Sequence, residues 1–580
     1  MKSISYQEKL DALRAEMKAH DVDGFLVPRA DEYQSEAIAP YAERLSWLTG
    51  FTGSAGIGII LEDQACVMSD GRYTIQLKQE VEEGLYHLVN SQEVPVEEWL
   101  SENVGKEKVI GYDPKLHTPH FIQKLEEAGV KLKSIEQNLI DLIWDDQPEP
   151  PKNKISLFPS EVAGQTAQEK IAAVQAILAE RGCGALVITQ LDSIAWLLNI
   201  RGADVENTPV PQASLILLEG EAQLFIDSEK LTEDIKENFQ SIISFHERNE
   251  EKDFLRQLHN QKIWLDTKRS SVYYKNILND IEEEEDPCVH LRACKSVEEQ
   301  EAMKEAHLLD GIAITKFLHW FDQEASKENL TEINVEEQLE RFRKEAPQYK
   351  EPSFSTIAGF GSNGAIVHYR ASQKTNKQIE QGNLLLLDSG GQYHYGTTDI
   401  TRTIAVGTPT EEMIHTNTLV LKGHITLATA QFTRETLGKE LDLYARGALA
   451  NEGLGYAHGT GHGVGCYLSV HEEAAMGISP RAEKPLAAGM ILSNEPGYYK
   501  EGEFGIRIEN LVLVKSKDEN ELYFETITLA PIDKTLIDKS LLTESEIQWF
   551  NSYHQAVFDA LSPHLEDGVK KWLEKATLPI

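Results

Sequence analysis

The chain lacks most of the features that mark secreted or membrane-bound proteins. Its five cysteines, among 580 residues, are odd in number and scattered, which argues against a disulfide framework or a cysteine zinc site. No apolar run approaches the ~20 residues that a membrane-spanning helix needs. The first nine residues contain no apolar segment typical of a secretion signal, and residues 6–18 have the pattern of an amphipathic helix. These absences predict a protein of the reducing cytoplasm with no membrane partner.

Basic residues are also scarce. Lysine and arginine together number 56, against 94 aspartates and glutamates, and the formal net charge is −38. The acidic residues are spread along the chain and form no tail. Nucleic acids and anionic membranes bind through basic patches that replace counterions, so this composition argues against either partner.

The first half of the chain contains an internal repeat. Residues 58–70 match residues 215–227 at a constant offset of 157, and both segments have the pattern of strand, two-residue turn and strand. Upstream, the segment around Trp47 matches the segment around Trp196, and each is preceded by a strand-like apolar run. Self-similarity at a fixed spacing predicts two copies of one α/β domain.

Composition places the domain boundaries. The length is too great for one core. Pro148-Glu-Pro-Pro151 cannot continue a helix or a central strand, so we expect a linker between a first domain at 1–150 and its repeat at 151–290. The acidic run 282–286 is expected to be a solvated boundary loop. A third domain at 291–580 would end in a helical extension from about residue 530.

Three helices are expected in the third domain. Ser296 and Glu299 have capping-box spacing and open a long helical pattern. A second helix is expected over residues 413–430. Near the end, Thr543 and Glu546 cap an amphipathic helix, which we expect to pack on the third domain.

A pair of aspartates lies in a predicted hairpin. The buried-strand pattern of residues 384–387 ends at Asp388, and after a turn at 389–398 the chain returns from Asp399. Period-2 alternation places Asp399, Thr401 and Thr403 on one face. The hairpin would bring the two aspartates to neighbouring positions, where they repel each other unless a cation or proton lies between them.

A pair of glutamates repeats this design about a hundred residues later. A strand ends at Glu495, where Pro496-Gly497 is expected to begin a turn, and the returning strand carries Glu509 on the same face as Arg507. Between the two hairpins lies a glycine-rich loop with His462 at its centre, where glycine allows close approach to a ligand. Four carboxylates and one imidazole approximately balance two divalent cations, so the sequence predicts a two-metal site.

These residues carry a resemblance to a known family. The chain resembles the pita-bread metallopeptidases, and among them the Xaa-Pro aminopeptidases (aminopeptidase P) in their three-domain form. The strings that carry it are Asp388-Ser-Gly, Thr398-Asp-Ile-Thr-Arg402, His458-Gly-Thr-Gly-His-Gly-Val-Gly465, Asn494-Glu-Pro-Gly-Tyr498 and Gly505-Ile-Arg-Ile-Glu-Asn510. The resemblance implies an α/β (α+β) fold with two related creatinase-like N-terminal domains before a pita-bread catalytic domain.

The resemblance also implies a metal centre and a mechanism. Two metals, usually Mn²⁺, would be bridged by a hydroxide that attacks the scissile carbonyl. Carboxylate oxygens suit Mn²⁺, and one imidazole keeps Co²⁺ and Zn²⁺ possible. By analogy, Asp388 binds one metal, His462 and Glu495 bind the other, and Asp399 and Glu509 contribute to both. Glu495 would act as general base and return the proton to the leaving proline nitrogen.

Further residues match the family's substrate-binding positions. His368 and His471 match histidines that contact the peptide and stabilise the oxyanion, and His458 is a third candidate. A pocket for the proline ring is expected to be walled by His368, His471, Tyr499 and Arg507. In the first domain, Arg72 matches an arginine that contacts substrate.

The resemblance therefore implies release of the N-terminal residue from peptides with proline at the second position, by a homodimer. A prolidase acting on Xaa-Pro dipeptides is the main alternative, and a creatinase-like amidinohydrolase is another enzyme of this fold. Methionine aminopeptidases lack the two N-terminal domains. A non-catalytic binding protein is less consistent with five intact ligand positions.

Overall fold

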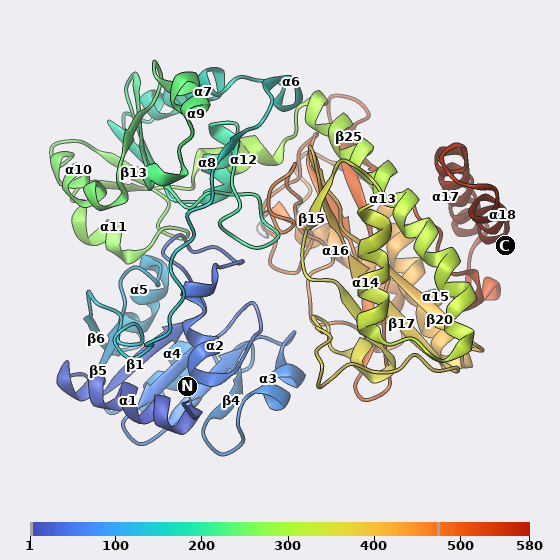
Figure 1. Cartoon of the computed structure of the whole chain (residues 1–580), viewed down its shortest axis with the longest axis horizontal. Coiled ribbons are helices and arrows are strands. Elements are labelled where there is room, and N and C mark those ends of the chain that lie inside the picture. Colours follow the sequence, from blue (N-terminus) through green and yellow to red (C-terminus); the bar gives the residue numbers. More distant parts are fainter. Residues whose placement is uncertain (1–3, 473–475) are drawn as a thin grey trace. The chain divides into compact units, whose positions relative to one another are not determined.

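The computed structural model describes residues 4–472 and 476–580, which form two compact units (Figure 1). The first unit comprises Met1–Ser160 and Gln165–Val289, and the second comprises Glu161–Gly164 and His290–Ile580. The first unit contains the two repeats and the second contains both carboxylate hairpins.

The first unit holds two six-stranded sheets of identical topology. The first sheet has the order β4-β3-β2-β1-β5-β6. Its strands are β1 (Gly24–Pro28), β2 (Ile57–Leu61), β3 (Ala65–Ser69), β4 (His87–Asn90), β5 (Val109–Tyr112) and β6 (Lys131–Ser134). The second sheet has the order β12-β11-β10-β8-β13-β14. Its strands are β8 (Ala185–Ile188), β10 (Ser214–Leu218), β11 (Glu221–Phe225), β12 (Ser244–His246), β13 (Ile263–Leu265) and β14 (Ile281–Glu283).

Strand directions also match between the two sheets. In each sheet the first strand of the hairpin pairs antiparallel with the central strand and with the second strand of the hairpin, and the outer strands add in parallel. The predicted hairpins are β2–β3 and β10–β11. The internal repeat read from the sequence is therefore confirmed.

Helices flank each sheet in corresponding positions. Those of the first repeat are α1 (Tyr6–Ala19), α2 (Arg44–Thr49), α3 (Thr74–Glu80), α4 (Val96–Asn103) and α5 (Pro119–Glu127). Those of the second are α7 (Ala167–Glu180), α8 (Leu191–Leu197), α9 (Glu233–Phe239), α10 (Glu251–Gln257) and α11 (Val272–Ile277). The opening helices α1 and α7 both begin with a capping box. The two matched tryptophans, Trp47 and Trp196, lie on α2 and α8.

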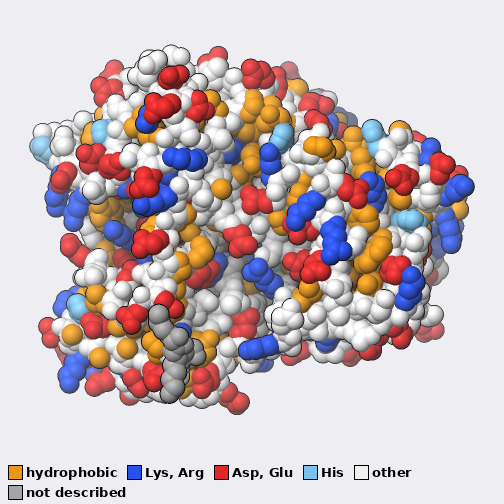
Figure 2. Space-filling model, viewed as in Figure 1, with side chains coloured by type: hydrophobic (Ala, Val, Ile, Leu, Met, Phe, Trp, Pro, Cys, Tyr) orange, Lys and Arg blue, Asp and Glu red, His pale blue; other side chains and the backbone are white. Residues whose placement is uncertain are grey.

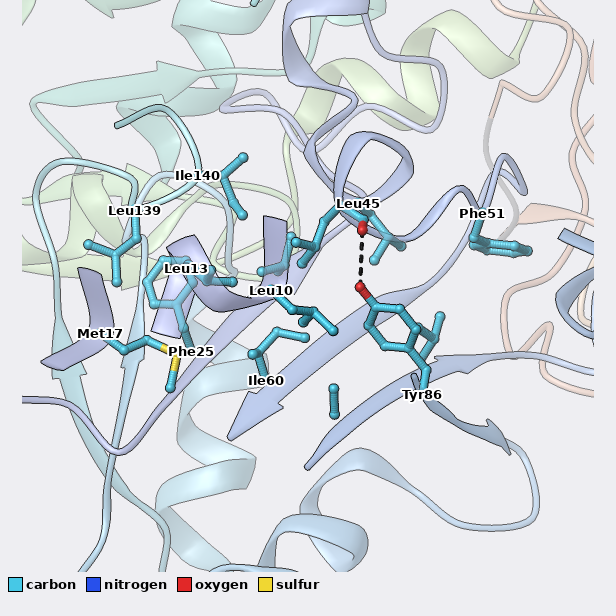
Figure 3. Close-up of a cluster of buried hydrophobic side chains, with 14 of the residues drawn as sticks. Leu10, Leu13, Met17, Phe25, Leu45, Phe51, Ile60, Tyr86, Leu139 and Ile140 are labelled. Atoms are coloured by element: carbon cyan, nitrogen blue, oxygen red, sulfur yellow. Dashed lines mark hydrogen bonds between the residues drawn. The ribbon is translucent and has the colours of Figure 1, made fainter. Parts of the chain in front are cut away.

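The apolar face of α1 anchors the first repeat. Leu10, Leu13 and Met17 are buried against a cluster that includes Phe25 and Ile60 (Figure 3). In the same cluster the Tyr86 hydroxyl donates to the carbonyl oxygen of Leu48 at 3.0 Å. The cluster buries the helix face that the spacing of its apolar residues predicts.

The expectation of a solvated loop over the acidic run 282–286 is wrong for residues 282 and 283, whereas residues 284–286 lie outside any helix or strand. Residues Ile281–Glu283 form the edge strand β14, parallel to β13. Glu282 and Glu283 form ion pairs with Lys262 and Lys275, at 2.5 and 2.8 Å. Lys262, next to β13, and Lys275 of α11 therefore offset the repulsion between neighbouring carboxylates together with the ladder hydrogen bonds, which the charge pattern alone did not reveal.

The second unit is built on short antiparallel sheets. One has the order β16-β17-β20, with β16 (Ile357–Phe360), β17 (Asn383–Ser389) and β20 (Ile400–Val406). Another has the order β21-β26-β25-β22, with β21 (Gln431–Thr433), β22 (Ile491–Asn494), β25 (Asn510–Ser516) and β26 (Glu521–Thr526). Smaller ladders join β23 (Gly497–Lys500) to β24 (Phe504–Arg507), and β15 (Tyr349–Pro352) to β18 (Gly391–Tyr393) and β19 (Gly396–Thr397).

Helices pack on both sides of these sheets (Figure 1). One core joins α13 (Val297–Glu324) and α14 (Glu332–Arg343) to β16, β17 and β20 through residues such as Leu385 and Leu387. A second core joins α15 (Glu411–Ala428), α16 (Gly438–Ala450) and α17 (Glu544–Leu561) to β17 and β24 through residues such as Leu384. Alternate residues of β17 thus enter opposite cores. The last helix is α18 (Asp567–Ala576).

The predicted helix starts are confirmed with one shift. Ser296 and Thr543 cap α13 and α17 through complete capping boxes. The helix expected over residues 413–430 begins two residues earlier, because Thr410 caps α15 by accepting from the Met413 amide. The apolar side of α17 packs on the second unit, as expected.

On the face shown in Figure 2, acidic side chains are interspersed with lysine and arginine. This mixture agrees with the even spread of charge along the sequence. Among the helices in residues 4–472 and 476–580, none is long and apolar enough to cross a membrane.

The core around α1 can be tested by truncation. Leu13 is fully buried, so Leu13→Ala should lower the free energy of unfolding of the first repeat by about 3 kcal/mol. Leu142 of the same repeat is 36% exposed, and Leu142→Ala should change it by less than about 0.5 kcal/mol. Urea unfolding measures both. Equal effects of the two substitutions would contradict the assigned core.

Candidate metal centre

The first carboxylate pair lies where β17 ends and β20 begins. In the antiparallel register, Asp388 is opposite Thr401, and Asp399 directly precedes β20. Asp388 is in step with Leu384 along β17, so it faces away from the core that holds Leu385 and Leu387. Both aspartates are buried, with 7% and 4% of their surface exposed. The hairpin brings them together as the sequence predicts.

The second carboxylate pair flanks the expected pairing of two strands, but a further pair of strands lies between them in the sequence. Glu495 follows β22 and Glu509 precedes β25, and these strands pair so that Asn494 is opposite Asn510. The expected turn at Pro496-Gly497 is wrong, because Gly497 begins β23, which pairs with β24 as far as Lys500. The chain turns at residues 501–503. Pro496 instead marks the point where it leaves one ladder for the next, since proline has no amide hydrogen for a ladder bond.

Two hydrogen bonds to Ser493 hold the backbone of His462 between the hairpins. Its amide donates to the Ser493 hydroxyl, and its carbonyl accepts from the Ser493 amide, both at 2.9 Å. A side chain at Gly461 would place its Cβ 2.0 Å from the Ser493 carbonyl oxygen, so this approach requires glycine. The ring Nδ1 donates to the Gly463 carbonyl at 2.9 Å, which leaves Nε2 directed to the carboxylates.

All five predicted residues converge. His462 Nε2 lies 3.5 Å from Asp399 Oδ2 and 3.6 Å from Glu495 Oε1. Ligand atoms of Asp399, His462 and Glu509 lie within 4.8 Å of one another. Asp388 completes the set, because its charge and those of Asp399 and Glu495 act on Glu509.

The carboxylates are under strong electrostatic strain. Burial raises the pKa of Glu495 to about 7, and the charges of Asp399 and Asp388 add to this against the opposing effect of His462 and Arg507. Burial and the three other carboxylates raise the pKa of Glu509 well above its usual value. Burial lowers the pKa of His462, but Asp399 and Glu495 outweigh it and raise the value to about 9. The protein alone therefore holds protons where cations would remove the repulsion.

The donor set fits a pair of hard divalent cations. The set consists of the oxygens of four carboxylate groups and one imidazole nitrogen. This mixture suits Mn²⁺ and is compatible with Co²⁺ or Zn²⁺. Asp388 Oδ1 is buried and has no hydrogen-bond partner among the described residues. A buried carboxylate oxygen without a partner is costly unless a cation binds it.

Arg507 is buried beside the first pair. It donates to Asp388 Oδ2 at 2.6 Å, to the Tyr499 hydroxyl at 2.5 Å and to the Val367 carbonyl at 3.3 Å. Tyr499 in turn lies 2.8 Å from His458 Nε2. The structure thus joins three of the predicted substrate residues in one hydrogen-bonded chain that ends on a carboxylate of the centre.

The other predicted histidines lie around the same loops. The ring of His471 packs edge-on against that of His462, with centroids 4.2 Å apart. His368 follows Val367, whose carbonyl Arg507 holds, and is partly exposed. Arg72 belongs to the first unit, where its guanidinium donates to both carboxylate oxygens of Asp70, at 2.9 and 2.8 Å.

The sequence analysis assigned no role at the site to two residues of β20. The Thr401 hydroxyl donates to Glu509 Oε2 at 2.7 Å, and the Arg402 guanidinium donates to the Glu509 carbonyl at 2.6 Å. Thr401 shares a face with Asp399 in the predicted alternation, which could have identified it. Arg402 reaches across more than a hundred residues of sequence, for which the chain gives no local signal.

Comparisons with known proteins agree with this geometry. The description "Metallopeptidase family M24" matches residues 301–516, and "C-terminal region of peptidase_M24" matches 520–580. Two creatinase/prolidase N-terminal domain descriptions match residues 9–143 and 146–299. A "Probable Xaa-Pro aminopeptidase P" of Coccidioides posadasii is 38% identical over the full length of both chains, and one of Paracoccidioides brasiliensis is 37% identical over both.

The chain belongs to the Xaa-Pro aminopeptidases of metallopeptidase family M24.

Solved structures support the same family. The X-prolyl aminopeptidase of Caenorhabditis elegans, described as a cytosolic enzyme with a di-nuclear active site, is 33% identical, matches all of both chains and gives a TM-score of 0.95. The prolidase of Pyrococcus horikoshii is 22% identical, with a TM-score of 0.51, over 63% of this chain and 99% of its own. That second likeness shows the shared fold alone. Membership of the family explains why four carboxylates are buried together.

The metal-free protein should lose stability as the pH rises. Glu495 and His462 both have folded-state pKa values above their usual 4.5 and 6.5, so their contribution to stability is present at low pH. It is lost as the pH rises through about 7 for Glu495 and about 9 for His462. Thermal unfolding in EDTA should therefore show a melting temperature roughly 5 °C or more lower at pH 9 than at pH 5.

Two controls accompany this measurement. Glu495→Gln cannot ionise, so it should flatten the curve between pH 5 and pH 7. Added Mn²⁺ should restore stability most at high pH, where binding releases no protons. A metal-free curve that is flat or rises with pH would contradict the assigned repulsion.

Proposed function

We propose that this chain is a metal-dependent aminopeptidase that releases the N-terminal residue from peptides with proline in the second position. The observation that carries the proposal is the convergence of five ligand-type residues in a chain that matches a di-nuclear X-prolyl aminopeptidase over its whole length. The fit of the donor set supports two Mn²⁺ ions, with Co²⁺ or Zn²⁺ as the other candidates.

The ligand roles are those that the resemblance to the family implies. Asp388 would bind one cation, His462 and Glu495 would bind the other, and Asp399 and Glu509 would contribute to both. Thr401 and Arg402 support this arrangement by fixing the Glu509 carboxylate and carbonyl. When bound, the two cations lower the pKa of a water molecule and polarise the scissile carbonyl.

Glu495 carries the proton. As general base it takes a proton from the attacking water, and it then returns the proton to the proline nitrogen, which is a poor leaving group until protonated. In the metal-free protein burial raises the pKa of this carboxyl to about 7, and bound cations would lower it, which leaves the carboxylate form that can accept a proton. Ser493 Oγ lies 3.3 Å from Glu495 Oε1 and helps to orient it.

The predicted histidines, Tyr499 and Arg507 bind the substrate. His368 and His471 contact the peptide and stabilise the developing oxyanion, with His458 as a third group. His368, His471, Tyr499 and Arg507 form the wall of the pocket for the proline ring. Arg507 also holds Asp388, so it links the proline pocket to the metal centre. Arg72 is proposed as a further substrate-contacting residue on the family resemblance alone. An Xaa-Pro bond has no amide hydrogen, so recognition of the ring replaces it.

The proposal includes the domain boundaries, the compartment and the oligomeric state of the protein. The domain boundaries are 1–150, 151–290 and 291–580, with the C-terminal extension from about residue 530. The protein acts in the cytoplasm as a homodimer. The cytosolic description of the Caenorhabditis elegans enzyme and five free cysteines, four of them buried, support the compartment. Nucleic acids and membranes are not partners.

Peptide length and sequence test the activity directly. The metal-loaded protein should release arginine from Arg-Pro-Pro and should leave Arg-Ala-Pro and the dipeptide Arg-Pro uncut. Chromatography of the products measures this. Preferred hydrolysis of Arg-Pro would indicate a prolidase, and an intact Arg-Pro-Pro would refute the proposal. Chelation followed by re-addition of each divalent ion identifies the metal that restores activity.

The role of Glu495 has its own test. Glu495→Gln removes the base, so kcat for Arg-Pro-Pro at saturating Mn²⁺ should fall by about 10²–10⁴-fold, with the fold retained. Glu452→Gln, at a half-exposed glutamate of the same unit that bonds His415, is the control and should leave kcat unchanged. Full activity of Glu495→Gln would exclude the proposed proton transfer.

A further inference from the structure

The two ligand hairpins are each held from behind by a helix. The residues next to the ligands, rather than the ligands themselves, make these contacts. In the first hairpin they are Ser389 and Thr398, which adjoin Asp388 and Asp399. In the second they are Asn494 and Asn510, which adjoin Glu495 and Glu509.

Asp310 of α13 holds the first hairpin. It is 4% exposed and accepts two hydrogen bonds from Arg343 of α14, at 2.7 and 3.2 Å. It also accepts from the Thr398 hydroxyl at 3.0 Å and from the Tyr393 hydroxyl at 2.8 Å. Arg343 donates in turn to the Ser389 hydroxyl at 3.0 Å. One buried ion pair therefore bonds to the neighbours of both aspartates.

His424 of α15 holds the second hairpin. Its Nδ1 lies 3.1 Å from the Asn494 carbonyl oxygen, and its Nε2 lies 3.2 Å from the side-chain nitrogen of Asn510. The tautomer with its proton on Nδ1 donates to the first and accepts from the second, so a neutral ring satisfies both. The Asn494 side chain donates back to the His424 carbonyl at 3.0 Å. Asn494 and Asn510 are paired across β22 and β25, so the one ring spans the pair.

The C-terminal helix α17 adds to this second contact. The Tyr553 hydroxyl donates to the side-chain oxygen of Asn510 at 3.2 Å, and Arg402 donates to the same oxygen at 2.8 Å. Trp549 of the same helix packs on the ring of His424, with centroids 5.8 Å apart. The C-terminal region is therefore part of the support of the glutamate pair.

We propose that Asp310 and His424 are positioning residues that set the geometry of the two carboxylate pairs for metal binding. This inference rests on the proposed function, since it concerns the same metal centre. Neither side chain is a ligand: Asp310 is saturated by four donors, and both nitrogens of His424 have partners among the described residues. They act through the backbone of the strand ends, in the way that outer hydrogen bonds orient metal ligands.

The test compares metal affinity with stability. Asp310→Asn and His424→Phe should each weaken Mn²⁺ binding by about 10–100-fold, measured by electron paramagnetic resonance of free Mn²⁺ in titrations of the full chain. Melting temperatures of the metal-free variants are measured in parallel. At saturating Mn²⁺, the kcat of both variants should lie closer to the wild-type value than their Mn²⁺ affinity does.

Matched controls separate positioning from general destabilisation. Asp204→Asn breaks an equally buried ion pair with Lys230 in the first unit. His554→Phe removes a buried histidine of α17 that accepts from the Ile532 amide at 3.0 Å. Both controls should lower the melting temperature and leave the Mn²⁺ affinity within about twofold of the wild type.

The outcomes decide between the alternatives. Equal losses of affinity in the controls, or unchanged affinity in folded Asp310→Asn and His424→Phe, would overturn the inference. If Asp310→Asn does not fold, Thr398→Val removes one of its four bonds and should weaken binding, while Thr398→Ser keeps the hydroxyl and should restore it. If the wild type itself binds no Mn²⁺, the proposed metal centre fails, and not this inference alone.

Discussion

The repulsion among four buried carboxylates is the constraint on which the rest of the second unit depends. Asp388, Asp399, Glu495 and Glu509 lie close together in surroundings that exclude most water, and burial and the neighbouring carboxylates raise the pKa values of Glu495 and Glu509. A protein without cations must protonate some of these groups or lose stability. Such a cluster persists only where the surrounding structure holds the strand ends in place. The two helical layers and their cores provide that rigidity.

The two contacts behind the hairpins differ in chemistry but share one property. Asp310 is balanced by Arg343, and His424 is neutral because burial, and then the charge of Arg402, lower its pKa to about 3. Neither contact therefore adds net charge next to the metal centre. Polar contacts of this kind orient the strand ends through hydrogen bonds. They leave the net charge of the metal centre to its own ligands.

The sequence predicted the parts of the site that depend on local pattern. Strand patterns located Asp388 and Asp399, and glycine spacing marked the loop of His462. The turn after Glu495 was misplaced, because Pro496 and Gly497 are typical of turns but here lie between two ladders. The contacts of Asp310, His424 and Arg402 with the ligand hairpins could not be predicted. Each of these residues bonds to a hairpin residue about 70 or more positions away in the sequence. The repeat in the first unit was predictable, because identical topology requires matching patterns in each copy.

Charge balance explains why Arg507 belongs inside the centre. Four carboxylates carry four negative charges, and the Arg507 guanidinium bonded to Asp388 offsets one of them. Two divalent cations, as in the proposed function, would bring the site to a small net positive charge. That excess would favour the deprotonated form of a water molecule, which is the nucleophile that hydrolysis requires. Without Arg507 the filled site would be neutral, and a water molecule would give up its proton less readily. Arg507 thus contributes to the chemistry through its charge, besides its contact with Tyr499 in the proposed proline pocket.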